Sequence, residues 1–98
     1  AIRHSPFVGK KIKKVAVLGG SGSFAIPSAR QQNADAFITA DLKYHQFYQG
    51  ESDLILIDVG HYESEQFTKN LIFDYLTKKM PNFAIVLSLT KTNPVNYF

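Results

Sequence analysis

The sequence predicts an α/β fold, with a largely parallel or mixed four-stranded sheet and helices packed on its faces. Two observations carry this prediction. Short apolar runs alternate with segments whose apolar residues repeat every three or four positions, as in βαβ units. Turn residues, Gly-Gly-Ser-Gly-Ser after the first run and Asp-Val-Gly after the third, then mark where strands pass into helices.

The four expected strands are short and mainly apolar. They cover residues 15–18, 36–40, 54–57 and 83–87. Continuous apolar runs of this kind are typical of strands buried on both faces of a sheet. The pattern leaves the strand order open, and it does not decide whether one strand runs antiparallel.

Three helical segments are expected between the strands, over residues 24–32, 41–49 and 61–79. Pro27 fits the first helix only in its first turn, because proline lacks the N–H that a helix interior uses. Asp41 is expected to cap the second helix. In the third helix, Leu71 and Tyr75 belong to an i, i+4 apolar stripe, and Pro81 marks the end of the helix.

Length and composition indicate one domain with one core. A chain of 98 residues with 45% apolar and 19% charged residues is neither disordered nor fibrous. No apolar run approaches the roughly 18 residues of a membrane span, and no secretory signal is present, so we expect a cytoplasmic protein without a membrane partner. We divide the chain into a basic lead-in or linker, residues 1–14, and an α/β domain, residues 15–98.

Charge and cysteine content limit the possible partners. Without cysteine, any metal ion must be held by His, Asp or Glu. Much of the net charge of +3 comes from Lys10, Lys11, Lys13 and Lys14. This cluster is compatible with nucleic-acid contact, but no aromatic residue lies among the lysines for base stacking. A solvated lead-in that keeps a strand edge soluble is the better interpretation.

Polar residues gather after the first three strands, where the ligands of open α/β sheets bind. Gly19 and Gly20 follow the first strand, and their N–H groups could contact a substrate or cofactor. The segment matches no phosphate-loop motif, so an ordinary turn is the alternative. After the second strand, Asp41 and His45 are spaced to share a helix face, where they could orient a metal ligand or transfer a proton.

His61 and Glu65 are the candidate metal ligands. In a helix their Cβ atoms would lie roughly 6 Å apart on one face, so that both side chains could reach one ion. Glu63 and Asp58 would add negative charge nearby. The alternative is that these glutamates only favour the first turn of a helix. Catalytic metal sites generally have at least three protein ligands, so two are too few.

Four segments together resemble the C-terminal part of the Nif-three-like family, whose bacterial members are known as GTP cyclohydrolase I type 2 homologues. They are VAVLGGSGS (15–23), ITADLKYHQ (38–46), LIDVGHYESE (56–65) and TNPVNYF (92–98). The turn at Gly19 and Gly20 matches the glycine-rich loop of that family.

The resemblance implies a metalloprotein with two divalent ions (Zn, Mn, Fe, Co or Ni) in a cleft, assembled as a toroidal homohexamer. His61 and Glu65 match the C-terminal pair of metal ligands of the family. Asp41 and His45 match an acidic residue and a histidine near the cleft. For the whole protein, the resemblance implies a metal-dependent hydrolase of unsettled substrate. The alternative is a metal-stabilised assembly that binds other proteins or nucleic acid without turnover.

The N-terminal ligands of the family have no counterpart in this sequence. We therefore expect the chain to be a fragment of a larger family fold, with an incomplete metal site and no activity by itself.

Overall fold

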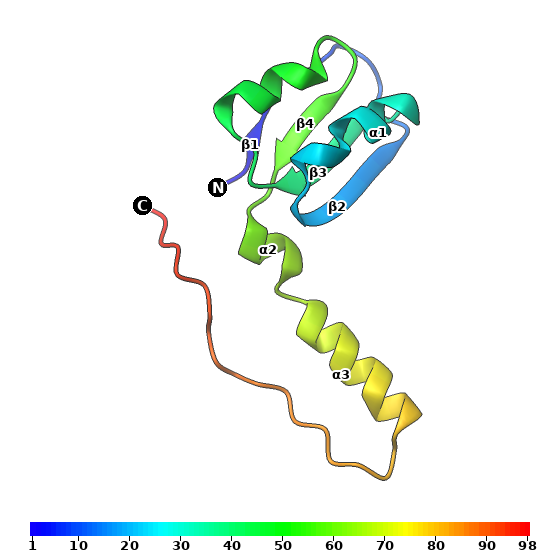
Figure 1. Ribbon diagram of the computed structural model, residues 1–98, viewed down its shortest axis with the longest axis vertical. Coiled ribbons are helices and arrows are strands. Elements are labelled where there is room, and N and C mark those ends of the chain that lie inside the picture. The colour runs from blue at the N-terminus through cyan, green and yellow to red at the C-terminus, as the bar shows by residue number, and fades with distance from the viewer. The chain divides into compact units, whose positions relative to one another are not determined.

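A four-stranded mixed sheet in the order β1-β4-β3-β2 organises the first part of the chain (Figure 1). Its parallel strands are β2 (Val15–Ser21), β3 (Ala36–Ala40) and β4 (Ile55–Asp58). The short strand β1 (Arg3–His4) pairs antiparallel with β4. The α/β prediction is confirmed, and β3 has the predicted bounds.

One predicted strand is absent, one observed strand was not predicted, and the first predicted strand, 15–18, continues to Ser21 as β2. Residues 83–87 do not form a strand, because no strand in the chain pairs with them, and Phe83 and Val86 remain exposed. The fourth strand of the sheet is instead β1, which was not predicted because Arg3 and His4 show no apolar pattern. It forms through long-range pairing with the end of β4, where Arg3 lies opposite Asp58.

The connections between the parallel strands are short helices. The first consists of a 3-10 turn η1 (Ser23–Ala25) and helix α1 (Ile26–Gln31), with Pro27 in the first turn as predicted. The second is a 3-10 helix, η2 (Tyr44–Gly50), which begins later than the predicted helix. Its N-cap is Lys43, whose N–H donates to the Gln46 side chain, so the predicted cap at Asp41 was wrong.

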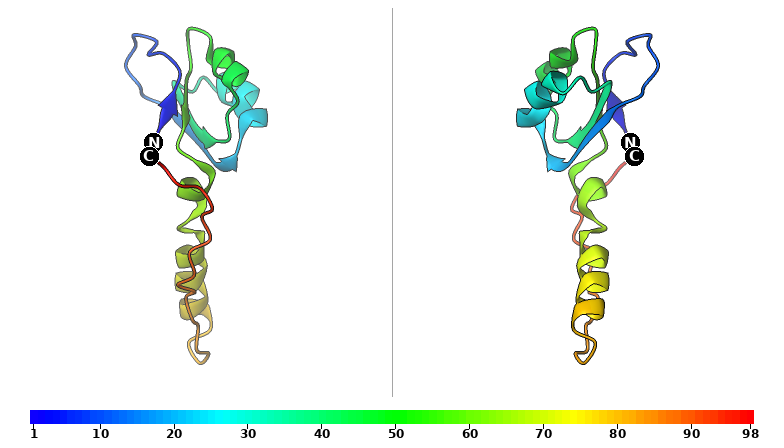
Figure 2. Two further views of the ribbon diagram at one scale, coloured as in Figure 1. Left: turned by 90° about the vertical axis from the view of Figure 1, so that its left-hand side faces the viewer. Right: turned by 90° about the vertical axis from the view of Figure 1, so that its right-hand side faces the viewer.

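The hydrophobic core lies between one face of the sheet and these short helices. Ala16, Phe37 and Leu56 form one row across β2, β3 and β4, and Ile26 and Ala29 of α1 pack in the same cluster. Figure 2 shows α1 and η2 on the same side of the sheet.

The opposite face of the sheet is more open at its β2 edge. The next row of the sheet, Val17, Ile38 and Ile57, belongs to this face, and Val17 is 70% exposed. The helix cover therefore lies on one face of the sheet.

Two helices follow β4 in place of the single predicted helix. They are α2 (His61–Glu65) and α3 (Thr68–Lys79), separated by a turn at residues 66–67. Neither glycine nor proline marks this break, so the periodic pattern predicted one continuous helix.

The structure, a computed structural model, describes all residues, Ala1–Phe98, as two compact units, Ala1–Ser64 and Glu65–Phe98. This division differs from the predicted one after residue 14, since β1 belongs to the sheet. The second unit has no buried residue, and the apolar stripe of α3, including Leu71 and Tyr75, is exposed.

Candidate functional site

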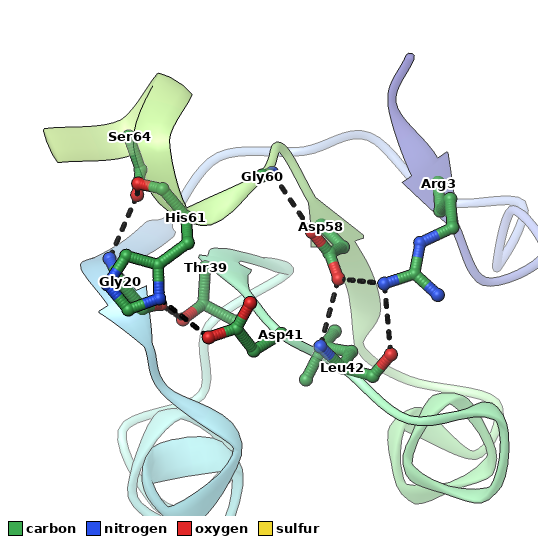
Figure 3. A network of polar contacts seen from close by, with 9 residues as sticks. All are labelled: Arg3, Gly20, Thr39, Asp41, Leu42, Asp58, Gly60, His61 and Ser64. Carbon is green, nitrogen blue, oxygen red and sulfur yellow. Dashed lines mark hydrogen bonds and ion pairs between the residues drawn. The ribbon is translucent and has the colours of Figure 1, made fainter. Parts of the chain in front are cut away.

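Hydrogen bonds join the C-terminal ends of β2 and β3 to helix α2, which follows β4 (Figure 3). The Gly20 N–H donates to Ser64 Oγ at 2.9 Å, and the Thr39 hydroxyl donates to the Gly20 carbonyl at 3.1 Å. The Ser64 hydroxyl donates to the His61 carbonyl at 2.9 Å. The C-terminal ends of the parallel strands thus lie side by side, at the edge where open α/β sheets bind their ligands.

The central contact of the site joins Asp41, which follows β3, to His61, which begins α2. Nδ1 of His61 lies 2.6 Å from Oδ2 of Asp41, and the two side chains are 50% and 48% exposed. An ionised carboxylate only accepts hydrogen bonds, so the hydrogen atom is on Nδ1 of His61. In the neutral ring the lone pair then belongs to Nε2, which is the nitrogen that could bind a metal ion.

The backbone at Asp41 adopts a left-handed conformation, with a φ of 58°. Asp and Asn tolerate this region better than other non-glycine residues. The conformation ends β3 and places Asp41 outside any helix, so the predicted shared helix face of Asp41 and His45 was wrong. His45 is exposed in η2, where its ring lies 5.3 Å from that of Tyr44.

A buried carboxylate, Asp58, lies beside this pair at the end of β4. It is 3% exposed and accepts hydrogen bonds from the N–H groups of Leu42 at 2.9 Å and Gly60 at 3.0 Å. Arg3 in β1 forms an ion pair with the same carboxylate and also donates to the Leu42 carbonyl at 3.0 Å. Both oxygens of this buried carboxylate therefore accept hydrogen bonds, and its charge is paired, as a buried charge requires.

Helix α2 begins with His61 and ends with Glu65, and both residues are exposed. The turn before it depends on Gly60, which has a φ of 90°. A Cβ atom at Gly60 would meet only the end of the flexible Glu63 side chain, so the positive φ is what favours glycine at this turn. The helix thus starts at the histidine itself, as the sequence predicted.

The chain contains no group of three or more His, Cys, Asp or Glu side chains that could hold a metal ion. His61 fits a metal site in kind, because a carboxylate bonded to the second ring nitrogen is typical of metal-binding histidines. The number of ligands does not suffice, since structural and catalytic sites generally have three or four protein groups. Any metal centre that uses His61 therefore needs ligands from another polypeptide segment or another copy of the chain.

Gly19 and Gly20 were predicted to form a turn after the first strand, but both lie within β2, which continues to Ser21. The Gly20 N–H is donated to Ser64, and a Cβ atom at Gly22 would lie 2.0 Å from the Thr39 hydroxyl oxygen. Gly19 is exposed, and its predicted contact with a substrate remains a prediction.

Part of the lysine cluster has structural partners. Lys10 forms an ion pair with Asp35 at 3.0 Å, and Nζ of Lys14 donates to the Gln32 carbonyl at 2.9 Å. The N–H groups of Lys14 and Lys13 donate to the same Asp35 carboxylate and, together with Lys10, hold its pKa well below its usual range. These contacts anchor the lead-in to the start of β3.

A cavity of about 190 Å³ lies away from the site, over α1 and η2. It is lined by Ile26, Pro27, Arg30, Gln49 and Glu51. Arg30 is paired with Glu51 at 2.9 Å and with Asp53 at 3.3 Å, and the hydrogen bond to Arg30 lowers the pKa of Glu51. The single cation of this cavity, Arg30, is thus already paired with carboxylates of the chain.

Sequence reasoning missed two contributors to the site. Arg3 was assigned to a lead-in, and nothing in the local sequence indicates its ion pair with a residue 55 positions away. Asp58 was considered only as a nearby negative charge. A polar residue directly after an apolar strand was the available signal, since such positions lie at the functional edge of α/β sheets.

No helix in the structure combines the length and apolar character that a membrane crossing requires.

Residues 1–94 match the Duf34/NIF3 (NGG1p interacting factor 3) family. Among curated relatives, the GTP cyclohydrolase 1 type 2 homologs of Staphylococcus aureus (strain MRSA252) and Campylobacter jejuni are 34% and 39% identical to this chain. The matches cover 93% and 91% of this chain but only 27% and 35% of those proteins.

Solved structures show the same fold. A Staphylococcus aureus protein superimposes with a TM-score of 0.79 at 30% identity, over 100% of this chain and 33% of its own. A Bacillus cereus protein related to NIF3 gives 0.75 at 28% identity, over 100% of this chain and 28% of its own. The family match over residues 1–94 and this common fold show that the chain belongs to the Duf34/NIF3 family.

Proposed function

We propose that His61 and Glu65 are ligands of a centre of two divalent metal ions, in a protein that acts as a metal-dependent hydrolase. The observation that supports this most is the hydrogen bond between His61 Nδ1 and Asp41. It fixes the ring so that Nε2 carries the lone pair, and it makes the ring a better ligand. Glu65 ends the same helix that His61 begins.

The residues of the chain have separate roles in this proposal. His61 and Glu65 bind the metal, and Asp41 orients His61 through its Nδ1–H. His45, which has no hydrogen bond to Asp41, is kept as a candidate for proton transfer. When bound, two divalent ions would polarise a substrate and lower the pKa of a water molecule toward neutrality. Zn, Mn, Fe, Co and Ni all accept imidazole and carboxylate ligands.

The substrate class is taken from the relatives. Because the curated relatives are called GTP cyclohydrolase 1 type 2 homologs, hydrolysis of GTP is the first reaction to test. The chain spans 27% and 35% of the length of those two relatives, so the activity belongs to the proposal for the whole protein.

Metal analysis tests the proposal most directly. We would measure metal content by mass spectrometry in the natively expressed protein and in its His61→Ala, Glu65→Ala and His45→Ala variants. We expect the first two variants to lose metal while their circular dichroism is unchanged. The matched control is His45→Ala. Because His45 is proposed to transfer a proton and not to bind metal, this variant should keep its metal but lose catalytic turnover. Wild-type metal content in both His61→Ala and Glu65→Ala would remove these residues from the ligand set.

A second function, assembly without turnover, is favoured by the exposed apolar side chains of residues 65–98. Large exposed apolar patches usually mark interaction sites, and this unit has no buried residue of its own. We propose that this surface mediates assembly, with the toroidal homohexamer as the form to test. Leu71→Glu should then lower the mass of the assembly measured by sedimentation. Lys79→Glu, at an exposed charged position of the same helix, should leave this mass unchanged. An unchanged mass in the Leu71 variant would contradict an assembly role for α3.

A further inference from the structure

Asp58 links three segments that are far apart in the sequence. Its carboxylate accepts hydrogen bonds from Leu42 and from Gly60 and is paired with Arg3 in β1 (Figure 3). The first two donors are direct neighbours of the paired residues, since Leu42 follows Asp41 and Gly60 precedes His61.

The sheet alone does not set the spacing of Asp41 and His61. The ladder between β3 and β4 ends with Thr39 opposite Asp58, and its last bond runs from the Val59 N–H to the Thr39 carbonyl at 3.0 Å. Asp41 lies two residues after Thr39, and His61 lies two residues after Val59, so both are beyond this last bond. Beyond the end of the ladder, the Asp58 carboxylate joins the two segments directly, because it accepts an N–H from each of them.

We propose that Asp58 is a positioning residue that sets the distance between Asp41 and His61. One carboxylate oxygen holds the backbone after Asp41, and the other holds the turn before His61. Arg3 stabilises this arrangement, because its guanidinium group binds both the Asp58 carboxylate and the Leu42 carbonyl. The importance of this positioning for metal binding rests on the proposed function, whereas its effect on the Asp41 and His61 pair does not.

The chain offers a matched control in Asp35. Its carboxylate also accepts two backbone N–H groups, from Lys13 and Lys14, at 2.8 Å each, and is also paired with one cation, Lys10. Asp35 precedes β3, at the opposite end of the strand from Asp41. An Asp→Asn substitution at either position removes the negative charge and the ion pair. Only Asp58→Asn must also lose a backbone bond, because the two oxygens of Asp58 accept one N–H each, whereas one oxygen of Asp35 accepts both. Only Asp58 bonds to the neighbours of the site pair.

The experiment records the His61 ring nitrogens by long-range ¹H–¹⁵N NMR in the metal-free chain, and measures stability by urea unfolding. We expect both Asp58→Asn and Asp35→Asn to lower the unfolding midpoint. Only Asp58→Asn should reduce the fraction of His61 that carries hydrogen on Nδ1. In the natively expressed protein, only Asp58→Asn should weaken metal binding, by about tenfold, the lower end for residues that orient ligands.

Arg3→Gln serves as a milder variant in case Asp58→Asn does not fold. The Arg3 side chain is 57% exposed, and its loss leaves both N–H bonds of Asp58 in place. We expect a smaller change of the His61 ring signals in the same direction. Wild-type ring signals in a folded Asp58→Asn or, if that variant does not fold, in Arg3→Gln would overturn the inference.

The two proposals can fail separately. Altered ring signals together with no metal in the wild-type protein would leave the positioning role intact and refute the metal site. Loss of metal in His61→Ala, together with wild-type ring signals in Asp58→Asn, would support the metal site and refute the positioning role of Asp58.

Discussion

Replacing Asp41 by Asn tests whether the carboxylate controls the tautomer of His61. Asn tolerates the left-handed backbone at this position, so the substitution isolates the loss of charge from backbone strain. Hydrogen bonds to charged groups contribute about 1.5–3 kcal/mol, against about 0.5–1.5 kcal/mol for neutral ones. Because both side chains are about half exposed, solvent screening places the difference at the lower end, at about 1 kcal/mol.

A free energy of about 1 kcal/mol corresponds to a factor of about five in an equilibrium constant. We therefore expect the ratio of Nδ1–H to Nε2–H His61 to fall about fivefold in Asp41→Asn. The Asn amide can also turn its NH₂ group toward Nδ1, which favours the other tautomer. The assay is ¹⁵N NMR of the histidine rings in the metal-free chain at mildly alkaline pH, where imidazole is neutral.

The matched control is Asp53→Asn, which alters an exposed aspartate paired with Arg30. This variant should leave the His61 signals unchanged. Equal tautomer ratios in the wild-type chain and Asp41→Asn would show that the carboxylate does not determine the state of the ring. The case for Nε2 as the ligand atom would then lose its main support.

Three further predictions concern the frame around the site. Gly22→Ala should lower the free energy of unfolding by about 1–3 kcal/mol in urea, because its Cβ would lie 2.0 Å from the Thr39 hydroxyl oxygen; a neutral result would contradict this close packing. Leu56→Ala should cost about 2–5 kcal/mol in the same assay, since Leu56 is 0% exposed, and a loss under 1 kcal/mol would place it outside the core. Asp35 has a lowered pKa in the folded state, chiefly through the Lys14 N–H, so its contribution is full above about pH 4 and is lost at lower pH. The difference in melting temperature between wild type and Asp35→Asn should therefore shrink as the pH falls below about 4, and a constant difference would argue against an ionised Asp35.

The parts of the fold that could be predicted are those with a local signal. The apolar run 36–40 is a strand in both prediction and structure, because each of its residues packs within the sheet. Residues 83–87 carry an equally apolar pattern but have no partner strand in the chain. An apolar run shows that burial is favourable, but only pairing makes it a strand.

The candidate site was predicted in its location but not in its contacts. The position of polar residues after parallel strands correctly indicated where Asp41 and His61 would meet. Their hydrogen bond spans 20 residues, so the i, i+4 rule instead suggested Asp41 and His45 as a pair. The left-handed backbone at Asp41, which separates it from the helix, follows from tertiary contacts and has no clear signal in the sequence.

Strand β2 is at the edge of the sheet, and its outer backbone groups have no neighbouring strand. Val15 and Val17 are exposed on it, so a second molecule could add to this edge and begin aggregation. The lysines just before β2 oppose such self-pairing by mutual repulsion. At 1 M ionic strength the Debye length is only about 3 Å, so charges farther apart than this hardly repel each other. Concentrated salt should therefore make the protein aggregate faster in solution.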